Sequence, residues 1–214
     1  MRRVVARFAR SGELLLLETR QRVEKPRPLV LLCDVSGSME RYSRLLLYFV
    51  HGLAHTLGRV EVFLFATRLT RVTRELAVRN ASAPLPAAAS RLSDWGGGTR
   101  IGEALRTFNL RWARRVMRHG PVVLLISDGW DRGEPAVLRT EIARLQRSCH
   151  RLIWLNPLLG SPGYRPLTRG MQVALPFVDD FLPVHNLVSL EMLADHLSRL
   201  PPRRSRSFAR SADL

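Results

Sequence analysis

Oxygen-bearing side chains gather in three short stretches of this 214-residue chain, each beside a segment with the pattern of a strand or a helix. DVSGS follows the apolar run PLVLLC, GGGT precedes a helical pattern, and SDG follows the apolar run VVLLI. Carboxylate and hydroxyl oxygens, without histidine or cysteine, are the ligands that hard divalent cations prefer. The stretches therefore predict a metal site with these candidate ligands: Asp34, Ser36, Ser38, Thr99 and Asp128.

The spacing within the stretches suits one small cation. Ser36 and Ser38 stand two positions apart, so a turn at Gly37 can aim both hydroxyls to the same side. The glycines at 96–98 let the second stretch pass close to an ion without a side-chain collision. The small number of carboxylates suits Mg²⁺, which retains water ligands, so we expect Mg²⁺, with Mn²⁺ as the alternative, and not zinc.

Each stretch alone also has an ordinary structural explanation. Asp34 and Ser38 suit helix caps, Thr99 suits the N-cap of the helix that follows it, and SDG is a common turn. Their joint occurrence in this order, each beside the end of a strand or a helix, favours a shared metal site.

An open coordination position on such a cation would take an anionic ligand, such as a carboxylate from a partner protein. No general base, activated nucleophile or phosphate-binding lysine accompanies the candidate ligands, and the single lysine, Lys25, is distant from every glycine loop. Phosphate chemistry needs such groups. We therefore expect a binding site and no enzyme, with a Mg²⁺-dependent hydrolase of phosphate esters as the alternative.

Apolar patterning predicts strands alternating with helices around these stretches. Short apolar runs between turn signals are typical of strands that are buried on both faces. The alternation predicts an α/β fold, with a doubly wound, mostly parallel sheet and helices on both faces, whose ligands bind beyond the carboxyl ends of the strands. Strands are expected at 28–34, 60–67, 122–128, 150–156 and 171–176, an edge strand at 70–76, and helices at 42–57, 101–117, 135–146 and 189–200.

The positions of proline residues and of the basic segments indicate where the expected domain begins and ends. Residues 1–27 form an arginine-rich arm with a short strand expected near 13–17, residues 28–200 form the domain, and the basic tail at 201–214 is expected to be disordered. The net charge is +16, but the arginines are spread through every expected helix and both ends of the chain. This distribution favours solvated surfaces, and an arginine-rich nucleic-acid-binding protein is the alternative.

The cysteines and the apolar segments indicate a cytoplasmic protein. Cys33 and Cys149 lie in or beside apolar runs without metal-ligand spacing, so we expect buried free thiols. The leucine run near the N-terminus is too short for a signal peptide, and no window approaches the length of a membrane span.

The three stretches resemble the metal-ion-dependent adhesion site of von Willebrand factor A (VWA) domains, which has the pattern DxSxS…T…D. The longer segments PLVLLCDVSGSMERYSR, DWGGGTRIGEALRTFN, LLISDGWDRG, CHRLIWLNPLLG and VDDFLPVHN are similar to CoxE-type proteins, over about residues 28–200. This resemblance implies a VWA fold and an adaptor that works with a MoxR-type AAA+ ATPase. The client would be a molybdenum hydroxylase, typically aerobic carbon monoxide dehydrogenase. CoxE-like proteins usually carry a longer region before the domain than the 27 residues here.

Three residues beside the second and third stretches are candidates for a partner-binding rim: Trp95, Trp130 and Asp131. Aromatic side chains are enriched at binding hot spots. The alternative is that the tryptophans pack under the loops and that Asp131 belongs to a solvated loop. Asn156 is expected in a strand-terminating turn at the same edge, and His185 is expected to be structural.

Overall fold

The computed structural model describes residues 22–56, 59–76 and 98–206. The chain divides into two compact units, one of residues Arg27–Leu200 and one of the terminal segments Met1–Pro26 and Pro201–Leu214. In the terminal unit, strand β1 (Arg22–Lys25) pairs antiparallel with strand β8 (Arg203–Arg206). The disorder expected from residue 201 onward therefore does not extend to Arg203–Arg206. The short strand expected near 13–17 lies outside the described residues.

The larger unit is built on a six-stranded sheet with the order β4-β3-β2-β5-β6-β7. All neighbouring strands are parallel except β4, which runs antiparallel to β3 at one edge. The expected doubly wound, mostly parallel sheet is confirmed. The strands are β2 (Leu29–Asp34), β3 (Val60–Phe65), β4 (Leu69–Arg71), β5 (Val122–Ile126), β6 (Arg151–Asn156) and β7 (Asp180–Pro183).

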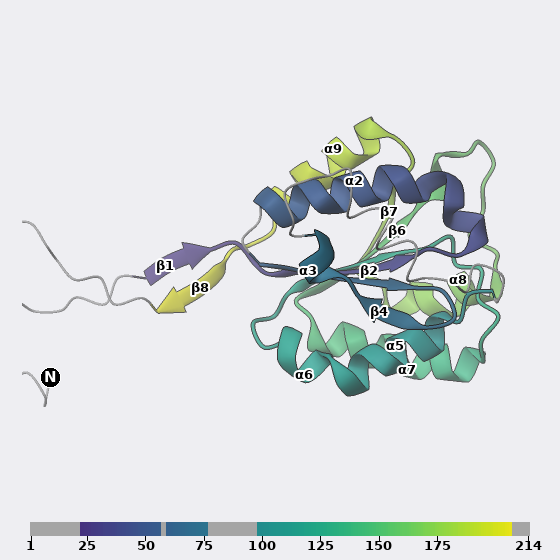
Figure 1. The fold of residues 1–214 in the computed structure, drawn as a ribbon, viewed down its shortest axis with the longest axis horizontal. Helices are drawn as coiled ribbons and strands as arrows, with labels where there is room; N and C mark the ends of the chain where they lie inside the picture. Colours follow the sequence, from purple (N-terminus) through teal and green to yellow (C-terminus); the bar gives the residue numbers. More distant parts are fainter. Residues whose placement is uncertain (1–21, 57–58, 77–97, 207–214) are drawn as a thin grey trace, which may run out of the picture. The chain divides into compact units, whose positions relative to one another are not determined.

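Helices cover both faces of the sheet (Figure 1). One face carries α2 (Glu40–Thr56), which η1 (Gly37–Met39) precedes, together with α3 (Thr73–Leu76) and α9 (Leu187–Ser198). The other face carries α5 (Ile101–Arg111), α6 (Ala113–Val116), α7 (Pro135–Ser148) and α8 (Arg169–Ala174). Two 3-10 turns, η2 (Pro157–Gly160) and η3 (Leu175–Phe177), follow β6 and α8.

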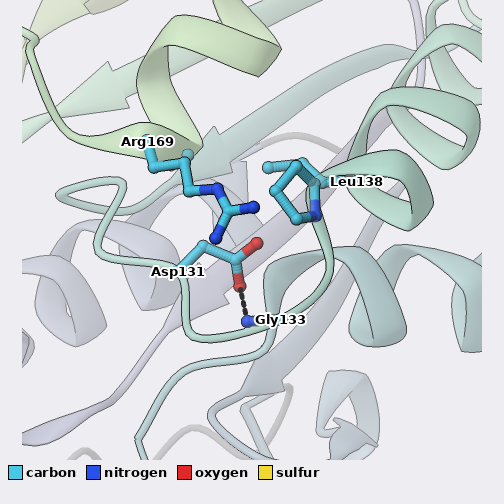
Figure 2. Close-up of a pocket in the computed structure, with 6 residues that line it drawn as sticks. Asp131, Gly133, Leu138 and Arg169 are labelled. Carbon is cyan, nitrogen blue, oxygen red and sulfur yellow. Dashed lines mark hydrogen bonds between the residues drawn. The ribbon is translucent and has the colours of Figure 1, made fainter.

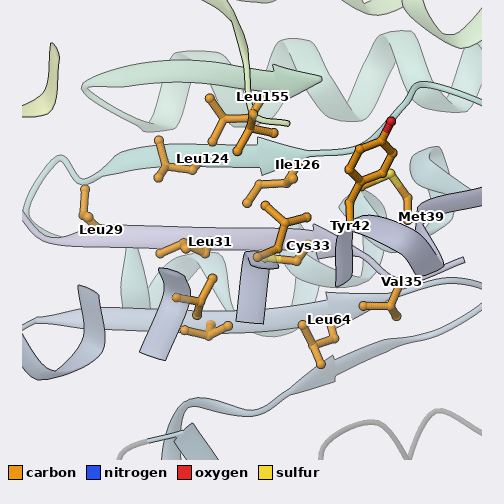
Figure 3. Close-up of a cluster of buried hydrophobic side chains, with 14 of the residues drawn as sticks. Leu29, Leu31, Cys33, Val35, Met39, Tyr42, Leu64, Leu124, Ile126 and Leu155 are labelled. Atoms are coloured by element: carbon orange, nitrogen blue, oxygen red, sulfur yellow. The ribbon is translucent and has the colours of Figure 1, made fainter. Parts of the chain in front are cut away.

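Alternate side chains of the central strands enter two separate cores, because successive residues of a strand point to opposite faces. Leu31, Leu124 and Ile126 pack on the side of α2 and α9 (Figure 3). Leu32 and Trp154 pack on the side of α5 and α7. Every residue of β2 and β5 is buried, as their continuous apolar runs predicted. β2 ends in Asp34 and β5 ends two residues before Asp128, so packing fixes both attachment points in the middle of the sheet.

The edge strand expected at 70–76 is shorter than predicted. It ends at Arg71, and residues Thr73–Leu76 form the helix α3. The Thr73 hydroxyl accepts a hydrogen bond from the backbone N–H of Val62 at 3.0 Å. A side-chain oxygen thus accepts the hydrogen bond that a backbone carbonyl of a continuing strand would accept. The strand prediction for residues 73–76 is therefore wrong.

The strand expected at 171–176 is also wrong. These residues belong to α8 and η3, and the last strand of the sheet is β7. Thr168 caps α8, because its Oγ1 accepts the N–H of Met171. Met171 and Ala174 are both fully buried, and their three-residue spacing is that of a helix face. The apolar run is too short for its hydrophobic periodicity to distinguish a helix from a strand.

The remaining helices follow the predicted pattern with shifted ends. The helix expected at 101–117 is interrupted at Trp112, whose ring packs edge-on against Phe63 with the ring centroids 5.5 Å apart.

Cys33 and Cys149 are free thiols, and burial raises the pKa of both to about 12, so neither is a reactive thiolate. Within the described residues, no helix combines the length and the apolar character that crossing a membrane requires.

Trp154 links β6 to the carboxyl end of β5, and its substitution tests this contact. The Trp154 ring is fully buried, and its Nε1 donates to the backbone carbonyl of Ser127 at 2.8 Å. Trp154→Phe removes the donor and part of the buried ring, so we expect the free energy of unfolding in urea to fall by about 2 kcal/mol. Leu110→Ala is the control, since Leu110 is 62% exposed and its truncation should change stability by less than about 0.5 kcal/mol. Equal losses in the two variants would contradict the assignment.

Candidate metal centre

The strand order places the candidate aspartates at the switch point of the sheet. From β2 the chain continues outward to β3 and β4, and it then returns to the other side of β2 to form β5, β6 and β7. Ligands of doubly wound sheets bind where the direction of winding reverses. Asp34 is the last residue of β2, and Asp128 follows two positions after the end of β5. The two carboxylates thus stand at the position where this fold forms its binding crevice.

Asp34 is held by hydrogen bonds at both carboxylate oxygens. Its Oδ1 accepts the backbone N–H of Ser36 at 2.9 Å, and its Oδ2 accepts the hydroxyl of Ser127 at 2.7 Å. The register explains the second contact, because Cys33 pairs with Ile126 and the next residues of the two parallel strands are Asp34 and Ser127. The Ser127 hydroxyl in turn accepts the N–H of Gly129 at 3.0 Å. A chain of hydrogen bonds therefore connects the first and third stretches.

The turn after Asp34 brings the two serine hydroxyls together. Ser36 has an extended backbone and precedes η1, and its carbonyl accepts the N–H of Met39 at 2.9 Å. The Oγ atoms of Ser36 and Ser38 lie 3.2 Å apart. The spacing of these serines predicted hydroxyls on the same side of a turn, and the geometry agrees with that arrangement.

Thr99 lies between the loops that follow β3 and β5. The N–H of Arg100 donates to the carbonyl of Ala66 at 3.1 Å, and the carbonyl of Thr99 accepts the N–H of Arg132 at 2.9 Å. Gly98 has a φ of 76°, which a residue with a side chain rarely adopts. Thr99 is itself 3% exposed. Trp95 and the glycines at 96 and 97 lie outside the described residues.

Asp128 is fixed by the turn that follows β5. Its Oδ1 accepts the N–H of Trp130 at 3.0 Å, and its carbonyl accepts a hydrogen bond from the Asn156 side chain at 3.3 Å. Asn156 is fully buried, and its Oδ1 also accepts the N–H of Leu158 at 2.8 Å. Asn156 thus terminates β6, as expected, and also holds the backbone of a candidate metal ligand. His185, expected to be structural, has its ring against Gly160.

The candidate hydroxyls line one groove of about 450 Å³. Asp34 and Asp128 are buried next to the hydroxyl-bearing residues of its wall, with exposures of 1% and 3%. The groove-lining residues are Ser36, Gly37, Ser38, Gly98, Thr99, Trp130, Asp131, Arg132, Thr168 and Arg169. The fold therefore brings the three predicted stretches to one place, and the roles of their side chains as metal ligands stay a prediction.

Burial and charge set the protonation of Asp34. Burial raises the pKa of Asp34 to about 6, and the negative charge of Asp128 adds to the increase, while hydrogen bonds from Ser127 and Ser36 lower it. A buried carboxylate next to another carboxylate is costly without a compensating cation. The two aspartates thus favour a cation between them.

The donor set fits a hard divalent cation. In the described part of the chain, no three His, Cys, Asp or Glu side chains gather into a metal-binding group. The candidate site instead combines two carboxylates with three hydroxyls, the oxygen donors that Mg²⁺ accepts together with water.

The predicted rim residues have different surroundings. Trp130 is 64% exposed and lines the groove. Asp131 lines it too, but its Oδ1 accepts the N–H groups of Ile101 at 2.9 Å and Gly133 at 3.1 Å, so it ties the start of α5 to the loop after β5. Burial raises the pKa of Asp131, and the charge of Arg169 opposes that increase. In Figure 2, the Arg169 guanidinium lies beside the Asp131 carboxylate.

Sequence reasoning missed two contributors to this region. Ser127 was treated only as part of a turn, although a serine that directly follows an apolar strand and precedes an aspartate was the available signal. Arg169 begins α8, two residues before the segment 171–176 that was predicted as a strand, and no local pattern linked it to the three stretches.

A comparison with known protein families identifies the family of this chain. The family model described as VWA domain containing CoxE-like protein matches residues 1–190. The chain belongs to this family. A search of curated proteins finds no significant match.

Solved structures show the same VWA fold at low sequence identity. Proximal thread matrix protein 1 from the mussel byssus aligns with a TM-score of 0.55 at 15% identity, over 88% of this chain and 51% of its own. BatB from Bacteroides thetaiotaomicron gives a TM-score of 0.51 at 17% identity, over 81% and 98% of the two chains. The pilus adhesin SpaC from Lactobacillus rhamnosus GG gives 0.52 at 18% identity, over 84% and 30%. The chain thus spans about half the length of the mussel protein.

Replacement of Asp34 tests the cost of its buried charge. Asp34→Asn keeps the shape of the side chain and removes its negative charge. A pKa raised from 3.8 to about 6 corresponds to about 3 kcal/mol, a penalty on the metal-free fold that is complete above pH 6 and relieved as the pH falls towards 3.8. In EDTA at neutral pH, we expect urea unfolding to show the variant to be more stable than the wild type, by an amount that shrinks in acid. Mg²⁺ should raise the melting temperature of the wild type only. A variant less stable than the wild type at every pH would contradict the prediction.

Ser127→Ala tests whether the hydrogen bond to Asp34 orients a metal ligand. Loss of a partner that orients a ligand typically weakens metal affinity by 10- to 100-fold, so we expect about a tenfold weaker affinity for Mg²⁺ by calorimetric titration. Ser198→Ala is the matched control, since the Ser198 hydroxyl bonds only locally, to the carbonyl of Asp195 in α9. Unchanged affinity in Ser127→Ala would remove Ser127 from the site.

Proposed function

We propose that this chain is a Mg²⁺-dependent protein-binding module, in which a carboxylate of the partner completes the coordination of the metal. The observation that carries the proposal is the convergence of three loops on one groove, with the hydroxyls of Ser36, Ser38 and Thr99 in its wall and two buried aspartates next to them. One solved form of the mussel protein has zinc in its metal-ion-dependent adhesion site, which supports a divalent metal at the matching motif of this chain.

Some residues of the groove would hold the cation, and others would contact the incoming ligand. Asp34 and Asp128 would hold the cation, with the serine and threonine hydroxyls and water as further ligands. When bound, Mg²⁺ supplies an open position that takes an anionic oxygen. Arg132 and Arg169 in the wall of the groove favour an anionic partner over a cationic one.

The composition of the groove supports binding over hydrolysis. Its lining residues, as far as the chain is described, include no His, Cys, Lys or Glu. The Asp131 oxygen that accepts two backbone hydrogen bonds is already used to hold the loop. Hydrolysis of a phosphate ester would require a positioned base or nucleophile beside the metal.

Membership of the CoxE-like family extends the proposal to partners. The chain would act as an adaptor between a MoxR-type AAA+ ATPase and a molybdenum hydroxylase such as aerobic carbon monoxide dehydrogenase, during maturation of the hydroxylase. The family match supports this role through the shared domain. Maturation of this kind would take place in the cytoplasm.

A pull-down from the source lysate tests the proposal. The tagged chain should retain an AAA+ ATPase or a molybdenum enzyme in Mg²⁺ and release it in EDTA, as identified by mass spectrometry. Asp128→Ala should lose the retained protein, because the cation loses one of its two carboxylates, and its circular dichroism spectrum should be unchanged. Asp195→Ala is the matched control, since Asp195 is exposed on α9.

The same preparations distinguish the alternatives. Turnover of a phosphate ester that rises with Mg²⁺ and disappears in Asp128→Ala would replace the binding proposal with a hydrolase. Retention of nucleic acid that weakens steeply with salt and ignores EDTA would indicate an arginine-rich nucleic-acid binder. Retention of the same proteins by the wild type and by Asp128→Ala would overturn the metal-dependent role.

A further inference from the structure

Arg132 occupies a fixed position beside the candidate metal ligands. Its backbone N–H donates to the carbonyl of Thr99 at 2.9 Å. Its side chain lies directly over Gly98, since a Cβ added to that glycine would stand 2.5 Å from the Cδ of Arg132. Both contacts join Arg132 to the loop that presents Thr99, so the arginine is placed by the same loop that completes the site.

The charged residues of the groove differ in whether a carboxylate faces them. Three charged side chains line the groove: Asp131, Arg132 and Arg169. The Asp131 carboxylate faces Arg169, as Figure 2 shows. Arg132 is exposed, and no ion pair within the described residues involves it. Its guanidinium therefore offers several N–H donors to a ligand in the groove.

Trp130 adds an apolar surface next to this cation. Its side chain is 64% exposed and lines the same groove. An exposed tryptophan beside an arginine is typical of a binding hot spot, because both side chains contribute large contact areas when a partner covers them. The groove thus places candidate metal ligands, a cationic side chain and an aromatic surface next to one another.

We propose that Arg132 determines which partner this groove accepts, and that the partner is an acidic segment with two carboxylates. The first carboxylate completes the metal site, and the second binds the guanidinium of Arg132 while the intervening backbone packs on Trp130. A carboxylate bound to the cation keeps only part of its acceptor capacity, whereas a second, free carboxylate can accept two parallel N–H bonds from the guanidinium of Arg132. This inference rests on the proposed function, because it requires a metal-bound carboxylate.

Selection from a library of random short peptides displayed on phage tests the inference. The probes are the wild type, Arg132→Ala and the control Arg106→Ala, each in Mg²⁺ and in EDTA. Arg106 is an exposed arginine of α5 that does not line the groove. The wild type and Arg106→Ala should enrich peptides with two acidic residues at a fixed spacing. Arg132→Ala should enrich peptides with a single acidic residue.

Affinities of the selected peptides provide the second measurement. By fluorescence anisotropy, Arg132→Ala should bind the two-acid peptides about tenfold more weakly than the wild type, because one charge-assisted hydrogen-bonded contact is lost. Its affinity for single-acid peptides should fall much less, because only the longer-range attraction of a positive charge in the groove is lost. The Mg²⁺-dependent rise in melting temperature should be the same in both proteins, which shows that the fold and the metal site are intact.

The outcomes separate this inference from the proposed function. Enrichment of single-acid peptides by the wild type, or equal affinity of both proteins for two-acid peptides, overturns the role of Arg132 and leaves the metal-dependent binding intact. Peptides that bind equally in EDTA, or the absence of acidic peptides in the Mg²⁺ selection, overturn the proposed function and this inference together.

Discussion

The hydrogen bond between the Ser127 hydroxyl and the Asp34 carboxylate is the interaction on which the candidate site depends. It joins the ends of β2 and β5, the two central strands on either side of the switch point. The parallel register makes the two residues neighbours, and the buried apolar runs of both strands prevent that register from slipping. The position of Asp34 is thus decided by the packing of the whole sheet.

The same arrangement buries two carboxylates whose mutual repulsion a bound cation would offset. Asp34 is almost fully buried, and the charge of Asp128 lies close enough to raise its pKa. The hydrogen bonds from Ser127 and Ser36 offset only part of the loss of hydration, so the pKa of Asp34 stays above its ordinary value. A protein gains nothing in stability from such a pair, and its presence at the switch point is typical of a functional site. The structure thus accepts a local cost at the candidate metal site.

The loops around the aspartates form the wall of the groove at the candidate metal site. The loop after β3 and the loop after β5 both bind the segment that carries Thr99, through Ala66 and Arg132. Arg132 and Trp130 line the groove beside the candidate metal ligands, and Asp131 accepts a hydrogen bond from the start of α5. The candidate metal ligands and the proposed partner-selecting surface are therefore parts of one set of loops. With such an arrangement, a common fold can serve partners of different chemistry, since the loops can change while the sheet remains.

The sequence by itself determined the central strands, the doubly wound class and the grouping of the three stretches of candidate metal ligands. Continuous apolar runs indicate buried strands, and short polar segments indicate turns. It did not determine that Thr73 ends β4, that residues 171–176 form α8 and η3, or that Arg203–Arg206 pair with Arg22–Lys25. Only the tertiary structure placed the Ser127 hydroxyl on Asp34 and the Arg132 side chain over Gly98. These contacts join residues that are distant along the chain, and a local pattern carries no information about which distant segments will meet.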